Sequence, residues 1–296
     1  MPCYNERDSL PKVVADIRAA MEGRDYTYEI LVVDDRSTDG SPAAAERLGC
    51  RVLRSAMHKG PGAARKTGIL AARGDIVVML DADGTCEAKA IPRLLSFFPA
   101  FDQVNGARLD GNGAVPALRV PPQWFIRKLA GYLASVEIPD LNTSLKAFKR
   151  RQMLPYLWTI PDGVSCVSSM TMAFLCNGHP VKYIPVEYYR KAGGRLPNPL
   201  LDTCNDIVTV FRLITYFEPL RIFFPVAALL IAGGSLTPAM EALYGQYSLR
   251  IADATLIVLG VVTGLHGLLA DMIVAQARTR AFVMRFRVER SVEEKE

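Results

Sequence analysis

The chain has 296 residues, half of them hydrophobic, and a formal net charge of +5. Its mean hydropathy of +0.15 is high for a soluble enzyme and low for a protein embedded wholly in a membrane, so we expect a mixture of the two. The six cysteines are far apart and none has metal-ligand spacing, which excludes a disulfide framework or zinc finger and favours reduced thiols in the cytosol.

The first hundred residues alternate between helical and strand patterns. A helix is predicted over residues 9–21, with Asp8 or Ser9 as its cap and Pro11 in its first turn, because apolar residues recur there at helical spacing. Further helices are predicted at 42–48 and 63–72, and strands at 29–33, 51–54 and 76–80. Because parallel strands need crossover connections, this alternation predicts an α/β domain whose parallel sheet lies between helices.

Residues 100–200 hold short segments broken by proline and glycine. The stretch PPQWFIRKLAGYLASV, at 121–136, has helical character, and HPVKYIPVEYY, at 179–189, is interpreted as one strand interrupted by Pro185.

The last third of the chain contains two long segments without charged residues. Residues 222–240 carry no charge, and neither do residues 254–270, which lie between Asp253 and Asp271. A bilayer core needs about 20 apolar residues as a helix, so a transmembrane hairpin is favoured over a pair of buried core helices. Arginines flank the hairpin on both sides, which predicts that both flanks are cytoplasmic. The division expected is a catalytic domain at 1–200, an interfacial amphipathic segment at 201–221, two membrane helices within 222–276, and a basic cytoplasmic tail at 277–296.

Two predicted strands end in pairs of acids. EILVVDD places Asp34 and Asp35 at the end of one strand, and IVVMLDAD places Asp81 and Asp83 at the end of another. Ligands of open α/β sheets bind at the carboxyl ends of the strands, so both pairs should face one cleft. Asp81 and Asp83 are spaced to share Mg²⁺ or Mn²⁺ beside a diphosphate, and the first pair could accept hydrogen bonds from ribose or base. The alternative is a pair of solvated turns.

The ordered motifs resemble glycosyltransferase family 2. They are MPCYNERDSL, EILVVDDRSTDGS, KGPGAARKTGILAARGDIVVMLDADGT and NGAR, followed by DLNTSLKAFKR, MTMAFLCNGHPVKYIPVEYYRKAGGR and FEPLRIF. Within the family, the chain is most similar to the polyprenyl-phosphate glycosyltransferases, which act on dolichyl or undecaprenyl phosphate. This resemblance implies a GT-A fold, a UDP- or GDP-sugar donor, Mg²⁺ or Mn²⁺, inversion at the anomeric carbon, and a place in the cell's inner membrane. Packing of the hairpin would also suit a homo-oligomer.

The resemblance also assigns roles to residues of this chain. Positions that contact the nucleoside are matched by Pro2, Tyr4, Glu6 and Asp35, with Asp34 beside them, while Asp81 and Asp83 match the metal ligands. Arg108 matches a phosphate-contacting arginine, and Asp140 matches an acid bordering the sugar pocket. The basic residues expected near donor and acceptor phosphates are Arg190, Lys191 and Arg195.

The chain departs from the family pattern at three places. Thr85 stands where some relatives have a glutamine on the metal side, and Leu145 stands where a glycine is usual. Relatives also have an apolar strand before the Pro-x-Tyr-Asn-Glu motif, whereas Met1 here occupies that strand's last position. We therefore expect unpaired backbone groups in the sheet, and we hypothesise that Met1 is an internal methionine with the start of the chain upstream.

A polyprenyl monophosphate is already an anion, so its attack needs no general base. Catalysis is therefore expected to rest on Asp81 and Asp83 with a cation and on basic residues, without an indispensable histidine. Lys59, Arg65 and Lys66, around the KGPG turn, are interpreted as solvated charges at a helix start rather than as phosphate ligands. The alternatives are a polysaccharide synthase, whose Q-x-x-R-W element is missing, a nucleotidyltransferase, whose phosphate loop is missing, and a catalytically inactive membrane scaffold.

Overall fold

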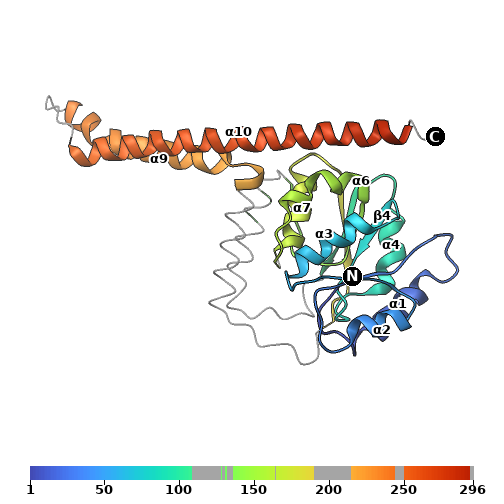
Figure 1. Cartoon of the computed structure of the whole chain (residues 1–296). Coiled ribbons are helices and arrows are strands. Elements are labelled where there is room, and N and C mark those ends of the chain that lie inside the picture. Colours follow the sequence, from blue (N-terminus) through green and yellow to red (C-terminus); the bar gives the residue numbers. More distant parts are fainter. Residues whose placement is uncertain are drawn as a thin grey trace. The chain divides into compact units, whose positions relative to one another are not determined.

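The computed structural model describes residues 1–108, 136–163, 165–189, 215–243 and 250–293, together with Lys128 and Gly131 (Figure 1). The chain divides into two compact units, Met1–Thr209 and Val210–Glu296. The predicted helix at 121–136 and the segment 201–214 lie outside the described residues, apart from three positions of the former.

The first unit begins with a parallel three-stranded sheet. Its strands are β1 (Pro2–Cys3), β2 (Leu31–Asp34) and β3 (Arg51–Arg54), in the order β1-β2-β3. The crossovers are the helices α1 (Leu10–Met21) and α2 (Ser41–Arg47), each with a proline in its first turn. These elements confirm the alternation read from the sequence, because the apolar face of α1 is the buried one.

A second, mixed sheet follows. Its strands are β4 (Ile76–Met79), β5 (Gln103–Arg108), β6 (Lys146–Lys149) and β7 (Val181–Val186), in the order β4-β6-β5-β7. Here β6 runs antiparallel to both neighbours, whereas β5 and β7 are parallel, as are the strands of the first sheet, so most of the strand pairs are parallel, as expected. The expected interruption at Pro185 was wrong. β7 passes through it, because among the described strands β7 lies at the edge of the sheet, where a missing N–H costs no ladder bond.

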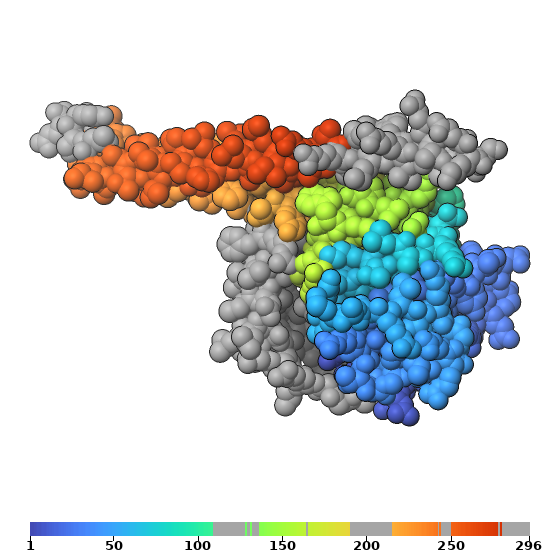
Figure 2. Space-filling model, viewed as in Figure 1, coloured from blue at the N-terminus to red at the C-terminus, as the bar shows by residue number. Residues whose placement is uncertain are grey.

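Helices cover both faces of the sheets. On one face, α1, η1 (Ala88–Ala90) and α4 (Ile91–Leu95) enclose a core that includes Leu94 and Val104. On the other face, α3 (Pro61–Ala71), α6 (Arg150–Met153), η3 (Leu154–Thr159) and α7 (Cys166–Leu175) enclose Phe148 and Phe174. In the space-filling view these blue and green segments form one continuous body (Figure 2). The five cysteines among the described residues are free thiols.

A cavity of about 620 Å³ separates β2 from β4, and its lining is mainly apolar. Among the described residues, β4 pairs only with β6. Arg150 N–H donates to the Asp75 carbonyl at 2.8 Å, and bonded residues alternate along an antiparallel pair, so Ile76 and Val78 direct their backbone groups away from β6 and into this cavity. The unpaired backbone groups expected from the sequence are therefore present at this edge.

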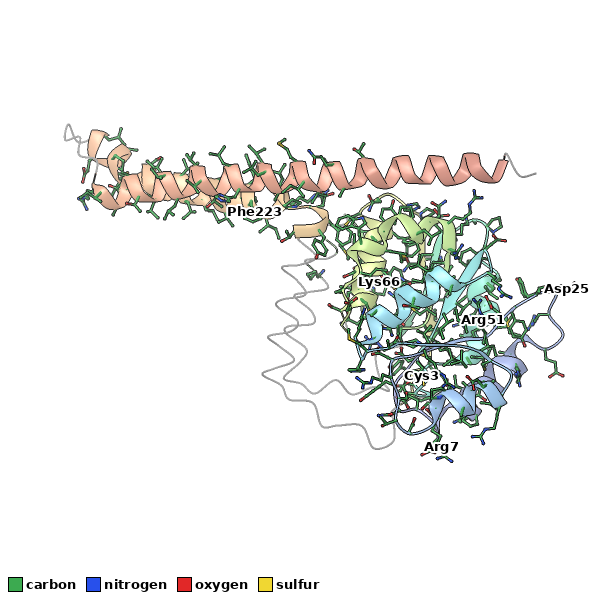
Figure 3. All side chains as sticks on the ribbon, viewed as in Figure 1. Cys3, Arg7, Asp25, Arg51, Lys66 and Phe223 are labelled. Carbon is green, nitrogen blue, oxygen red and sulfur yellow. The ribbon has the colours of Figure 1, made fainter. Side chains whose placement is uncertain are left out.

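The second unit is a helical hairpin of α9 (Leu220–Leu243) and α10 (Ile251–Glu293). The parts Leu220–Glu241 and Ile251–Ala277 are long and apolar enough to cross a membrane, and only 17% of each apolar window is buried, which disfavours core helices. Close approach depends on glycines: a Cβ on Gly260 would lie 2.6 Å from Ile231, and one on Gly267 would lie 2.6 Å from Phe223, labelled in Figure 3.

Candidate functional site

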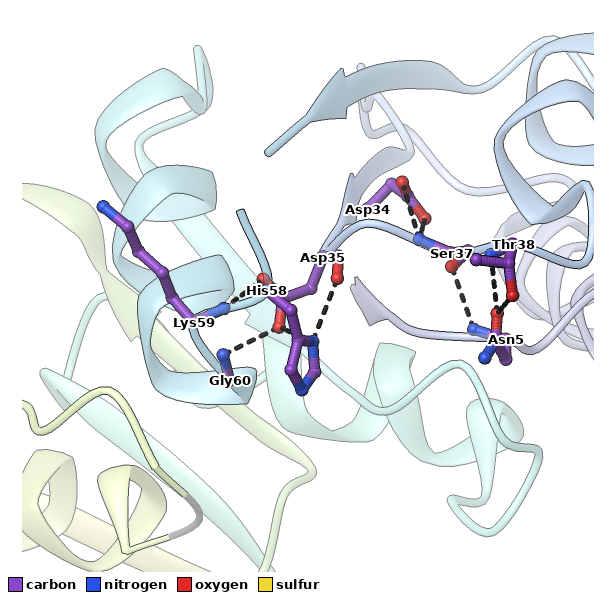
Figure 4. Close-up of polar contacts among 8 residues, drawn as sticks. All are labelled: Asn5, Asp34, Asp35, Ser37, Thr38, His58, Lys59 and Gly60. Atoms are coloured by element: carbon purple, nitrogen blue, oxygen red, sulfur yellow. Dashed lines mark hydrogen bonds and ion pairs between the residues drawn. The ribbon is translucent and has the colours of Figure 1, made fainter. Parts of the chain in front are cut away.

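The carboxylates after β2 hold the neighbouring loops in place. Asp35 is 3% exposed, and its Oδ1 accepts Lys59 N–H at 3.0 Å while its Oδ2 accepts Gly60 N–H at 2.7 Å (Figure 4). Asp34 is equally buried, and both of its oxygens accept Ser37 N–H, at 3.2 and 3.3 Å. Most of the accepting capacity of this pair is thus directed at the protein itself, and the predicted contact of Asp34 and Asp35 with a ribose or base stays a prediction.

The loop after β1 is fastened to the loop after β2. Asn5 has a φ of 55°, its N–H donates to Ser37 Oγ at 2.9 Å, and its Oδ1 accepts Thr38 N–H at 2.8 Å. Pro2 lies in β1 beside Val33. The loop leaves the Tyr4 ring exposed, 4.3 Å from the ring of His58.

Asp81 follows β4 and forms an ion pair with a buried arginine. Arg65, on α3, has a side chain only 5% exposed; its guanidinium donates to Asp81 Oδ1 and, through Nη1, to Cys166 Sγ at 2.9 Å. Burial opposes the charge of Arg65, but Asp81 and Cys166 outweigh it and raise the arginine pKa. The interpretation of Arg65 as a solvated charge was therefore wrong.

Asp83 is oriented by the residue that departs from the family pattern. The Thr85 hydroxyl donates to Asp83 Oδ1 at 2.6 Å, and the Thr85 N–H donates to the same oxygen at 3.1 Å. Thr85 is 4% exposed. At this position the threonine fixes the orientation of the Asp83 carboxylate through its hydroxyl and its N–H.

These two acids suit a hard divalent cation. The described hydrogen bonds of Asp81 and Asp83 all use Oδ1, which leaves Oδ2 of each for a ligand. Two carboxylate oxygens with open positions for phosphate and water are typical of Mg²⁺ and Mn²⁺ sites. A cluster of three or more histidine, cysteine or acidic ligands is absent from the described residues, so protein ligands beyond this pair are not found there.

At the end of β5, Arg108 forms a two-pronged ion pair with Asp140. Nε lies 2.7 Å from Oδ2 and Nη2 lies 2.8 Å from Oδ1. Burial opposes the charge of Asp140, but the hydrogen bonds and charge of Arg108 outweigh it and lower the pKa of this carboxyl. The Arg108 guanidinium also lies 5.6 Å from the centre of the Tyr188 ring.

Backbone contacts bring these loops together. The Ser9 hydroxyl donates to the carbonyl of Ala82, the residue between Asp81 and Asp83, at 2.7 Å, and its oxygen lies 3.0 Å from Glu6 Oε2. On the other side, Tyr189 N–H donates to the Thr85 carbonyl at 2.9 Å, next to the bridge between Cys86 and Tyr188. The ends of β1, β4 and β5 therefore border one site. Arg190, Lys191 and Arg195 lie outside the described residues.

The sequence predicted no role for His58, and it led to the wrong expectation that Arg65 is exposed to solvent. A signal for Arg65 was available, because Ile69 lies four residues later on the same helical face and is buried. For His58 there was no signal, since its partner Asp35 is 23 residues away in the chain.

Comparison with known proteins agrees with this architecture. The model of the family described as "Glycosyl transferase family 2" matches residues 1–175. A dolichyl-phosphate hexose transferase of Haloferax volcanii is 29% identical over 195 residues, covering 65% of this chain and 82% of that protein. An undecaprenyl-phosphate 4-deoxy-4-formamido-L-arabinose transferase of Pseudomonas paraeruginosa is 34% identical over 156 residues, covering 51% and 46%.

Solved structures give the same fold. Glucosyl-3-phosphoglycerate synthase from Mycobacterium tuberculosis, in complex with Mn²⁺, UDP and phosphoglyceric acid, superposes with a TM-score of 0.56 at 18% identity, over 72% of this chain and 76% of that one. The α/β unit thus has the GT-A fold that the sequence implied. By the family match over more than half of its length, the chain belongs to glycosyltransferase family 2 and is a glycosyltransferase.

Proposed function

We propose that this enzyme transfers a sugar, with inversion, from a UDP- or GDP-sugar to a polyprenyl phosphate at the cytoplasmic face of a membrane. The observation that carries the proposal is the juxtaposition of a two-carboxylate cation site with the Arg108–Asp140 pair, on a chain that also bears two membrane-length helices. The names of the polyprenyl-phosphate relatives support the acceptor.

The donor would be held at its diphosphate. A cation on Asp81 and Asp83 would neutralise diphosphate charge as the leaving group departs, which is the chemistry such an ion supplies in this family of sites. Arg108 carries a fixed positive charge on the same side, with a side chain 41% exposed and held in place by Asp140. Its guanidinium has five donor hydrogens, so the pair with Asp140 leaves others for a phosphate oxygen.

The acceptor needs no proton removed, because a phosphate monoester attacks as an anion. Asp140 fits this chemistry: its lowered pKa and its ion pair with Arg108 keep it ionised, so it positions an arginine rather than delivering a proton. The protein's task is then to align two anions and exclude water. The hairpin would keep the site near the headgroups, where the phosphate of a membrane isoprenoid lies.

The orientation follows from charge. Arg221 lies at the start of α9, and the stretch after the second apolar segment is rich in arginine, whereas the loop between the helices carries few charges. Basic residues favour the cytoplasmic side of a membrane, so both ends of the hairpin would be cytoplasmic.

The test is a panel of radiolabelled UDP- and GDP-sugars presented to the full-length chain in membranes or detergent with undecaprenyl or dolichyl phosphate. We expect one sugar to give a lipid-extractable product that depends on Mn²⁺ or Mg²⁺, with the opposite anomeric configuration to the donor. Asp83→Ala should abolish it. The matched control is Asp25→Ala, since Asp25 is exposed at the tip of the loop between α1 and β2 (Figure 3). A lipid product formed equally without metal would contradict the role of the cation, whereas no product with any donor would contradict the proposal and favour the inactive scaffold.

A further inference from the structure

An aromatic corner borders the site at the ends of β1 and β3. His58 follows β3 and Tyr4 follows β1, and their ring centres are 4.3 Å apart at an angle of 36°. The His58 side chain is 51% exposed, and Tyr4 is 48% exposed. The two exposed rings are in tilted contact and come from separate loops, so they form an aromatic corner beside the site.

The histidine is held in one orientation. Its Nδ1 lies 2.9 Å from Asp35 Oδ2 and 3.1 Å from the Asp35 carbonyl oxygen (Figure 4). Both of these atoms are acceptors, so Nδ1 must carry the proton. In the neutral ring Nε2 is then an acceptor, and it points away from Asp35 without a hydrogen-bond partner in the described part of the chain.

Both oxygens of the Asp35 carboxylate already accept hydrogen bonds from the protein. Asp35 is almost completely buried, and its two oxygens accept Lys59 N–H, Gly60 N–H and His58 Nδ1–H. The polar atom that this corner presents to a ligand is therefore Nε2 of His58, while Asp35 acts through the imidazole that it orients.

We propose that His58 is a specificity residue for the nucleobase of the donor, and that its Nε2 accepts a hydrogen bond from a ring N–H of that base. The proposal rests on the function proposed above and deepens it. A ring N–H at this edge is offered by uracil and guanine, whereas cytosine and adenine present an acceptor nitrogen there. The site should therefore prefer UDP over CDP and GDP over ADP.

Variants separate base recognition from support of Asp35. His58→Asn keeps an amide within reach of Asp35 but removes the atom at the Nε2 position. His58→Gln places an amide near the Nε2 position. His179→Asn is the matched control, because His179 is 7% exposed and is bonded to Asp102 and Tyr156 rather than to the site.

The experiment is a calorimetric titration of the full-length chain with Mn²⁺ and UDP, CDP, GDP or ADP, with Mn²⁺–pyrophosphate as a probe that has no base. We expect His58→Asn to weaken the preferred nucleotide by about 3- to 10-fold, from one hydrogen bond, and to shrink its preference over CDP or ADP to a similar degree. Pyrophosphate affinity should not change, His58→Gln should regain part of the affinity, and His179→Asn should bind as the parent does.

In sugar transfer the same factor should appear in the donor KM, with kcat changed less than about threefold, because base contacts are made equally in ground and transition states. If the parent shows the nucleotide preference and His58→Asn retains it in full, the inference is overturned and the proposed function survives. If the parent binds none of the four nucleotides with Mn²⁺, the proposed function fails and this inference fails with it.

Discussion

The cavity between β2 and β4 predicts that an added strand will stabilise the first unit. The perturbation is a five-residue apolar extension, such as Val-Ile-Val-Ile-Val, joined to the amino end of Met1. The Met1 nitrogen already donates to the Leu31 carbonyl at 2.8 Å, in the manner of a parallel strand beside β2, so an extension would run along the cavity. Ile76 and Val78 would supply backbone partners on its other side.

The magnitude follows from the size of the cavity. A strand residue occupies roughly 160 Å³, from a rise of about 3.3 Å, a strand spacing of about 4.8 Å and a layer spacing of about 10 Å, so 620 Å³ accommodates about four residues. Burial of four branched side chains contributes about 6–12 kcal/mol and ordering them costs about 6–10 kcal/mol, so these two contributions nearly cancel, and the net gain comes from the few new backbone hydrogen bonds at about 1 kcal/mol each. A net gain of about 2–4 kcal/mol corresponds to a rise in Tm of roughly 5–15 °C for a unit of this size.

The assay is thermal unfolding of the full-length chain in detergent, followed by tryptophan fluorescence, with a Gly-Ser extension of the same length as the control. Hydrogen exchange should also slow at the amides of Ile76 and Val78 in the apolar variant alone. If the two extensions give the same Tm and the same exchange, the two sheets are not joined by a strand and the reasoning is wrong.

Three further predictions concern single residues. Burial lowers the pKa of Lys146 from 10.5 to about 7, so the unfolded chain binds more protons between these values; stability should rise with pH across that window, by up to about 5 kcal/mol, and Lys146→Met should remove this slope in urea titrations. Burial opposes the charge of Asp102, but its hydrogen bonds with Lys149 and His179 outweigh burial and lower the pKa of this carboxyl. Asp102→Asn should therefore cost about 1–3 kcal/mol at pH 7, and this cost should shrink as the pH falls below 3.8 and through the lowered pKa, as chemical unfolding over a series of pH values would show. Asp83→Ala should lose Mn²⁺-dependent UDP or GDP binding while Tm falls by less than about 4 °C, because the residue is only half-buried; a parent-like affinity would rule it out as a metal ligand.

Local pattern predicted the first unit well up to β4. The apolar stripe of α1, the run of β3 and the acid-tipped ends of β2 and β4 are all properties of short stretches, and the structure confirms them. The direction of β6 was not predictable in this way, because a buried strand has the same composition whether it runs parallel or antiparallel to its neighbours. Arg65 shows a different limit. It was interpreted as solvated because it is charged, whereas its position on α3 faces the sheet.

The motifs alone did not predict that four of the five aspartates at the site also hold neighbouring backbone in place. Asp34, Asp35, Asp83 and Asp140 each accept a backbone N–H at this edge of the sheets. The donors are Ser37 for Asp34, Lys59 and Gly60 for Asp35, Thr85 for Asp83, and Arg108 and Asn142 for Asp140. A carboxylate is well suited to this task, because it accepts from several donors at once and stays charged while doing so.

Because acids hold the loops in place, binding of a nucleoside diphosphate should depend on a cation. The same carboxylates that fix the loops gather negative charge where a diphosphate must bind, and two anionic groups repel at short range. Arg65 compensates Asp81 from the buried side, and Arg108 compensates Asp140, but each is already paired within the protein. Asp83 has only the hydroxyl and N–H of Thr85 as described partners, so its charge remains for a cation to balance. A nucleoside diphosphate should therefore bind together with a divalent ion, and the free nucleotide should bind much more weakly than its Mn²⁺ complex.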